Sequence, residues 1–187
     1  MSDVVLVVPP NPSMADPRIA PSLGALYLAA AQREAGLGTP RVVDLNVECF
    51  QPETPCEHPG GSTHDFSLAN CLRLIPGGAD VYGLTVASMQ MQHAVPIFRS
   101  LREREPGAVL VAGGAHASAA PDDLVGLADV VVRYEGEDAW VAVLLALRTA
   151  EIYGRPAAPS PEALVVAAPR LAGRVAIRGR SHADGAE

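Results

Sequence analysis

The chain has few aromatic side chains and lacks the long apolar run of a membrane-spanning helix. Aromatic residues make up 4% of its 187 residues although 49% are hydrophobic, so alanine, valine and leucine must fill most of the core. No apolar run reaches the roughly 18–20 residues that a spanning helix needs. The N-terminus enters an apolar segment almost at once, without a secretory signal. The sequence therefore predicts a cytoplasmic protein that contacts no membrane.

Positive charge and cysteine are also scarce. The chain has 14 basic and 21 acidic residues, a net charge of −7, and no basic cluster before its last twenty residues, so we expect no nucleic-acid partner. The three cysteines, Cys49, Cys56 and Cys71, match neither a paired zinc motif nor the C-x3-C-x2-C of a radical SAM iron–sulfur cluster. We expect reduced thiols and no protein ligand to a metal ion.

Short apolar segments alternate with segments of helical periodicity. The expected strands are residues 4–8, 41–45, 80–86, 109–113 and 129–133, and the expected helices are 22–36, 67–75, 92–105, 121–127 and 138–150. In most of these strands the apolar residues are consecutive rather than alternating, which indicates a sheet covered on both faces. Right-handed crossovers then give an α/β fold with a doubly wound, Rossmann-like parallel sheet of five strands.

The composition changes near the C-terminus. Residues 1–154 are expected to form one domain, and a Pro/Ala-rich linker begins at residue 155. Ala163–Ala168 and Arg174–Arg178 are expected to pair as a small hairpin, followed by a flexible tail from Ser181 to Glu187. Residues 155–187 would thus be a short extension.

The ends of the expected strands indicate a ligand site. In a doubly wound sheet, ligands bind beyond the carboxyl ends of the strands, where the strand order reverses. The segment V-L-V-A-G-G-A-H-A-S, Val109–Ser118, ends its strand in Gly113-Gly114, and the absence of side chains there lets a ligand press against the backbone. Other strands end at Pro9-Pro10, at Ala87-Ser88 and at Tyr134–Glu137.

These segments resemble the cobalamin (B12)-binding domain found at the N-terminus of cobalamin-dependent radical SAM enzymes. The matching pieces, in order, are V-V-L-V-V-P-P, P-S-L-G-A-L-Y-L-A-A-A, D-V-Y-G-L-T-V-A-S, V-L-V-A-G-G-A-H-A-S and D-V-V-V-R-Y-E-G-E. They cover roughly residues 3–150. The resemblance implies a flavodoxin-like sheet with cobalamin over its carboxyl edge and the nucleotide tail inserted into the end of the sheet.

A tail channel needs small residues along its path, and hydroxyl groups there can bond the tail. The resemblance and the strand ends together place the following residues at the cofactor: Pro10, Asn11, Gly83, Thr85, Val86, Ala87, Ser88, Met89, Gly113, Gly114, Ala115, His116, Tyr134, Glu135 and Gly136. No catalytic residue is predicted. We expect Gly113→Val or Gly114→Val to abolish cofactor retention while the fold survives.

Two departures from the wider family bear on function. The Asp-x-His-x-x-Gly loop that supplies a cobalt ligand in the methionine-synthase and mutase type has no counterpart in Pro9–Ala20, so we expect no direct protein ligand to cobalt. The chain also carries no radical SAM barrel or cluster cysteines. We therefore expect a separate corrinoid subunit that is no complete enzyme alone and works with a radical SAM partner, for methyl transfer or related chemistry at cobalt. The alternatives are a non-catalytic cobalamin-dependent regulator, sensor or carrier, and a flavodoxin-like domain for another nucleotide-tailed cofactor or none.

Overall fold

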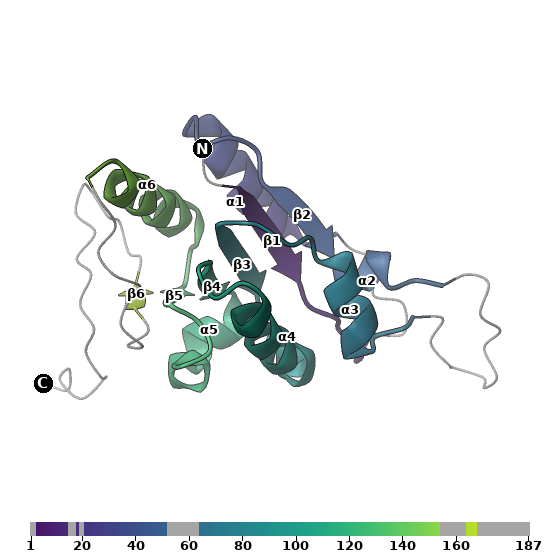
Figure 1. Ribbon diagram of the computed structural model, residues 1–187. Coiled ribbons are helices and arrows are strands. Elements are labelled where there is room, and N and C mark those ends of the chain that lie inside the picture. Colours follow the sequence, from purple (N-terminus) through teal and green to yellow (C-terminus); the bar gives the residue numbers. More distant parts are fainter. Residues whose placement is uncertain (1–2, 15–17, 19–20, 52–63, 154–163, 168–187) are drawn as a thin grey trace, which may run out of the picture.

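The computed structural model describes residues 3–14, 18, 21–51, 64–153 and 164–167, which fold around a parallel sheet (Figure 1). Its six strands lie in the order β2-β1-β3-β4-β5-β6, and every neighbouring pair is parallel. They are β1 (Val4–Val8), β2 (Arg41–Asp44), β3 (Val81–Thr85), β4 (Val109–Gly113), β5 (Val130–Arg133) and β6 (Leu164–Ala167). The first five form the order 2-1-3-4-5, which is that of flavodoxin-like folds.

The strand order reverses between β1 and β3. From β1 the chain crosses to β2 on one side, and β3, β4 and β5 are then added on the other. Thr85 at the end of β3 is in register with Gly113 at the end of β4. The carboxyl ends of these strands therefore meet at one edge of the sheet, next to the reversal point.

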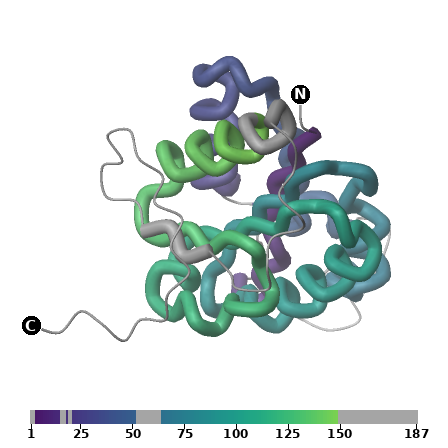
Figure 2. The backbone as a smooth tube through the Cα atoms, turned by 60° about the vertical axis from the view of Figure 1, so that its left-hand side comes forward, coloured from purple at the N-terminus to yellow at the C-terminus, as the bar shows by residue number. Residues whose placement is uncertain are grey.

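Helices cover both faces. The helices α1 (Leu23–Glu34) and α6 (Glu137–Tyr153) lie against one face, and α2 (Leu45–Glu48), α3 (Leu68–Leu74), α4 (Met91–Arg104) and α5 (Ala115–Ala119) against the other (Figure 1). Although α1 and α6 come from opposite ends of the described chain, they lie side by side (Figure 2). Strand residues contribute alternately to the two buried clusters, because successive side chains point to opposite faces.

The five predicted strands are all present, and a sixth joins them. Leu164–Ala167 was expected in a hairpin, but it pairs in parallel with β5 and extends the main sheet. An apolar strand that follows α6 can continue the β–α–β pattern in this way. Its expected partner, Arg174–Arg178, lies outside the described residues, as do the linker that begins at residue 155 and the expected tail.

Two further features concern the predictions from composition. Among the described residues, no helix is long and apolar enough to cross a membrane. Cys49 and Cys71 are buried free thiols with their sulfur atoms 3.9 Å apart, and Cys56 lies outside the described residues. The hydrogen bond to Cys71 and burial both raise the pKa of Cys49, which keeps this thiol protonated.

Candidate functional site

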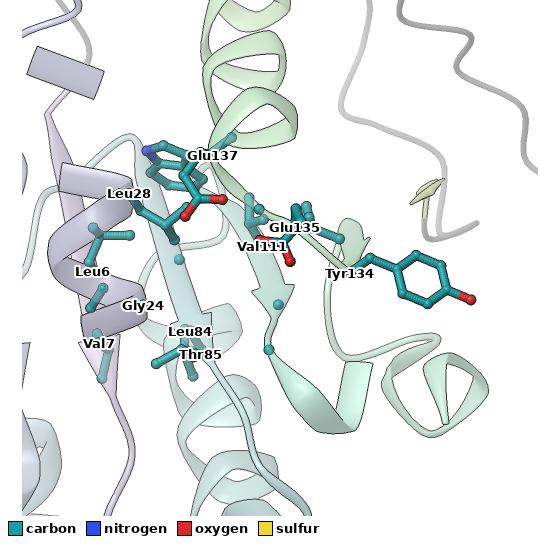
Figure 3. Close-up of a pocket in the computed structure, with 17 residues that line it drawn as sticks. Leu6, Val7, Gly24, Leu28, Leu84, Thr85, Val111, Tyr134, Glu135 and Glu137 are labelled. Carbon is teal, nitrogen blue, oxygen red and sulfur yellow. The ribbon is translucent and has the colours of Figure 1, made fainter. Parts of the chain in front are cut away.

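A pocket of about 180 Å³ opens between α1 and α6 on one face of the sheet (Figure 3). Its lining is apolar over most of its surface and includes five glycines. The lining residues are Leu6, Val7, Gly24, Ala25, Leu28, Gly83, Leu84, Thr85, Val111, Gly113, Gly114, Val132, Tyr134, Glu135, Gly136, Glu137 and Trp140. Seven of the fifteen residues predicted from the sequence are among them: Gly83, Thr85, Gly113, Gly114, Tyr134, Glu135 and Gly136.

The indole of Trp140 forms one wall of the pocket and packs on Gly83. A Cβ atom at Gly83 would lie 2.9 Å from Cδ2 of Leu6 and 3.0 Å from the Trp140 ring, so only glycine lets the ring approach the strand this closely. The indole N–H donates to Oε1 of Gln32 at 3.1 Å, and Nε2 of Gln32 donates to the carbonyl of Leu37 at 3.3 Å. This buried chain of hydrogen bonds fixes the ring in place.

The two adjacent glycines, Gly113 and Gly114, have different roles. A Cβ atom at Gly113 would have no atom closer than 3.9 Å, where it would meet Val132. Gly114 has a φ of +99°, and a Cβ atom there would lie 2.9 Å from both the backbone nitrogen and the carbonyl oxygen of Val86. Gly113 therefore keeps space open, whereas Gly114 permits the turn from β4 into α5. The expectation that valine is tolerated by the fold at either position is wrong for Gly114.

The helix α1 also contributes a glycine, which sequence reasoning missed. A Cβ atom at Gly24 would have no neighbour within 4 Å, and Gly24 lines the pocket from the first turn of α1. Glycine lowers helix stability by about 1 kcal/mol relative to alanine in a helix interior. A glycine near the start of an alanine-rich helix was therefore a sequence signal for a site that needs space. The apolar lining residues Leu28 and Trp140 gave no such signal, because they read as ordinary core.

The loop from β5 into α6 and the first residue of α6 supply the acidic groups of the pocket. Tyr134 has a φ of 61°, a left-handed conformation that is uncommon for a bulky residue. Its backbone N–H donates to Oγ of Ser118 at 2.8 Å, and its hydroxyl accepts from Arg133 at 3.0 Å. Its ring points away from the pocket, whereas the side chains of Glu135 and Glu137 lie on the pocket side (Figure 3). The bulk of Tyr134 thus does not fill the pocket.

The other eight predicted residues do not line this pocket: Pro10, Asn11, Val86, Ala87, Ser88, Met89, Ala115 and His116. They lie in the segments that follow β1, β3 and β4. Gln90 joins the first two of these segments, since its Oε1 accepts from the Ala87 N–H at 2.8 Å and its Nε2 donates to the Pro9 carbonyl at 2.6 Å. Oδ1 of Asn46 accepts from the Asn11 N–H at 2.7 Å. These two buried amides, absent from the prediction, fix the loops at the reversal point.

His116 is buried and held by protein atoms. Its Nδ1 lies 3.0 Å from Oγ of Ser88, and its Nε2 lies 3.2 Å from Oδ2 of Asp123 without hydrogen-bond geometry. Both ring nitrogens face side chains, so His116 connects α5 to the loop after β3. His93, in the first turn of α4, packs edge-on against Phe66, and burial lowers its pKa. The described residues contain no group of three or more His, Cys, Asp or Glu side chains that could hold a metal ion.

Comparison with known families agrees with this geometry. A family model described as "B12 binding domain" matches residues 17–144, which is more than half of the chain and includes most of the pocket. No curated protein matches the chain. The doubly wound parallel sheet is consistent with the flavodoxin-like α/β fold of B12-binding domains. The chain therefore belongs to the B12-binding domain family, and its cofactor is cobalamin.

Proposed function

We propose that the pocket between α1 and α6 holds the nucleotide tail of cobalamin. Cavities of about 150 Å³ accept a benzene-sized ring, so a pocket of about 180 Å³ suits a benzimidazole base but excludes the much larger corrin. The space beside Gly24 and Gly113, where a Cβ atom would meet nothing within 3.5 Å, supports this assignment. The residues present fit the tail, and we place the corrin ring outside the pocket.

The apolar walls supply the binding energy in this proposal. An aromatic ring system buries about 150–250 Å². At about 25 cal/mol per Å², this burial stabilises the complex by roughly 4–6 kcal/mol before the entropy of immobilisation is subtracted. Trp140 and Leu6 offer flat and branched apolar surfaces for this contact, and the hydrogen bond to Gln32 holds the indole ready for it.

Cobalt supplies the chemistry of the bound cofactor, and this chain binds, orients and shields it. We propose that no side chain of this protein ligates cobalt. The loop after β1 carries no histidine between Pro9 and Ala20. The ring of His116 supports the same proposal, because Ser88 and Asp123 already face its two nitrogens.

We further propose that the protein is a cytoplasmic corrinoid subunit, with residues 1–154 as its cobalamin domain, for a separate radical SAM protein that carries out methyl transfer. The resemblance of five ordered segments to the domain of cobalamin-dependent radical SAM enzymes supports this role. So do Leu23, Tyr27 and Met89, which are large apolar residues about half exposed. They lie at the start of α1 and after β3, next to the carboxyl edge, where a partner that covers the corrin would bury them.

The first test is cofactor retention. The purified protein is incubated with hydroxocobalamin, desalted, and its visible spectrum recorded. We expect a near-stoichiometric corrin spectrum of the form without the benzimidazole ligand, together with quenching of Trp140, the single tryptophan of the chain. A spectrum with the benzimidazole still on cobalt would contradict a tail held in the pocket, and a colourless protein in the presence and absence of the partner would contradict cobalamin binding altogether.

The second test concerns the partner. The cobalamin-loaded protein is mixed with a purified radical SAM protein, and cleavage of S-adenosylmethionine and transfer of the methyl group are measured. We expect both to depend on this chain, and Tyr27→Glu to weaken the complex without changing retention of cobalamin. Cobalamin binding with no effect on any radical SAM protein would favour the alternative, a regulator or carrier.

A further inference from the structure

The pocket is mostly apolar, yet its lining includes the two carboxylates of Glu135 and Glu137. Most of the lining residues are Leu, Val, Ala, Gly and Trp, and the ionisable groups of the lining come from the loop after β5 and from the first residue of α6. Glu137 is half-buried in the first turn of α6, and its side chain lies on the pocket side (Figure 3). A carboxylate placed at an apolar binding surface needs a hydrogen-bond donor to offset its loss of hydration.

We infer that Glu137 recognises the ribose of the nucleotide tail by accepting a hydrogen bond from one of its hydroxyl groups. The inference rests on the proposed function. An ionised carboxylate is an acceptor only, so its ligand group must be a donor. The phosphodiester of the tail has no donor and carries charge of the same sign, and the benzimidazole base carries no N–H when uncharged. The donors that remain are the ribose hydroxyls and the amide N–H of the linker to the corrin, and our proposal leaves that linker outside the pocket with the corrin.

This contact also orients the tail. With the ribose beside the start of α6, the base faces the apolar wall made by Trp140 and Leu6, and the phosphate is kept away from Glu135 and Glu137. The opposite orientation would bring the phosphate against two carboxylates, and the base would leave both of them without a donor. Glu137 is therefore a specificity-determining residue for corrinoids that carry a nucleotide.

A purely structural role for Glu137 makes a different prediction. An acidic residue in the first turn of a helix interacts favourably with the helix dipole, and Asp138 occupies the same turn of α6. Asp138 is exposed and does not line the pocket, so it is the matched control. A dipole effect would appear for both residues as a change in stability, whereas a contact with ribose would appear for Glu137 alone as a change in affinity.

The test compares two ligands with three variants. Equilibrium binding of cobalamin and of cobinamide, which lacks the nucleotide, is measured for the wild-type protein and for Glu137→Ala, Glu137→Gln and Asp138→Ala. We expect Glu137→Ala to weaken cobalamin binding about tenfold or more and to leave cobinamide binding unchanged. Glu137→Gln keeps one acceptor oxygen and should show a smaller loss. Asp138→Ala should bind both ligands as the wild type does.

Each other outcome has a defined meaning. Equal losses for cobalamin and cobinamide, no loss for Glu137→Ala, or tighter cobalamin binding by that variant would each overturn the inference. If the wild-type protein binds the two corrinoids equally, the tail does not enter the pocket, and the proposed function fails with the inference. Circular dichroism of each variant establishes that it is folded, and Glu137→Gln, which keeps the shape of the side chain, provides the test if Glu137→Ala unfolds.

Discussion

Replacing Gly113 by valine should close the proposed tail pocket and leave the sheet intact. Gly113 ends β4 without a positive φ, and its nearest contacts for an added Cβ atom are 3.9 Å away on Val132. Valine is well suited to a strand, so the backbone need not move. Its three side-chain carbons would enter the pocket, because Gly113 lines it.

The size of the effect follows from the pocket. If each added carbon takes up about as much space as a water molecule, roughly 30 Å³, valine removes about half of the 180 Å³. Forcing extra atoms into a filled site costs about 1–3 kcal/mol, and complete expulsion of a ring system would lose the roughly 4–6 kcal/mol of its burial. We therefore expect the dissociation constant of cobalamin to rise at least about tenfold for Gly113→Val.

The assay is a titration with cobalamin and cobinamide, followed by the visible spectrum and the Trp140 fluorescence. Gly107→Val is the control, because Gly107 is exposed before β4, has no positive φ, and an added Cβ atom there meets nothing within 4 Å. Cobinamide binding should be unchanged in both variants. Wild-type affinity of a folded Gly113→Val protein for cobalamin would refute the assignment of the pocket to the tail.

Three further predictions concern stability. Gly114→Ala should destabilise the fold by about 2 kcal/mol or more, because φ is +99° and Cβ would meet the backbone of Val86 at 2.9 Å; urea unfolding measures this, and an unchanged midpoint would contradict it. Gly83→Ala should lower the free energy of unfolding by about 1–3 kcal/mol and shift the Trp140 fluorescence emission, because the added Cβ would lie 3.0 Å from the indole. An unaltered emission spectrum and an unaltered stability would argue against this packing. Burial lowers the pKa of His93 in the folded state. Between that lowered pKa and the usual pKa of about 6.5, the unfolded state therefore binds more protons than the folded state. The free energy of unfolding then falls as the pH falls through this range. His93→Gln should flatten this part of the pH dependence of unfolding, and an identical slope in both proteins would exclude the contribution.

Local patterns were sufficient to predict the parallel sheet, because most of its strands are continuous apolar runs bounded by Gly, Pro or charged residues. They were not sufficient for β6, where a short apolar run after a Pro-rich segment fits a hairpin and an added edge strand equally well. The strand order places Leu164–Ala167 beside β5, and no local pattern of a single strand encodes its neighbour.

The residues of the candidate site also divide into those that local patterns in the sequence predict and those that they do not. Gly83 inside β3 and Gly113 at the end of β4 were identified because glycines in apolar strands are visible in the sequence, and both line the pocket. His116 was placed at the cofactor by its position after Gly114, but a buried histidine held by Ser88 cannot be distinguished in sequence from one that faces a ligand. Gln90 was missed because its hydrogen bond to Pro9 joins residues 81 positions apart.

The small apolar surface that α1 buries has a consequence for the lifetime of the complex between this protein and cobalamin. Of its twelve residues only Ala25 and Gln32 are fully buried, while Leu23, Leu26 and Tyr27 are about half exposed. A segment that buries so little apolar surface opens by local unfolding more readily than the strands beneath it, and its amide protons exchange sooner. A tail inserted beneath α1 could leave only when α1 opens. The rate of local unfolding of α1 would therefore limit the rate of cofactor release. Cobalamin binding should then slow amide exchange in α1. In the complex, the rate of this exchange should follow the rate at which the cofactor dissociates.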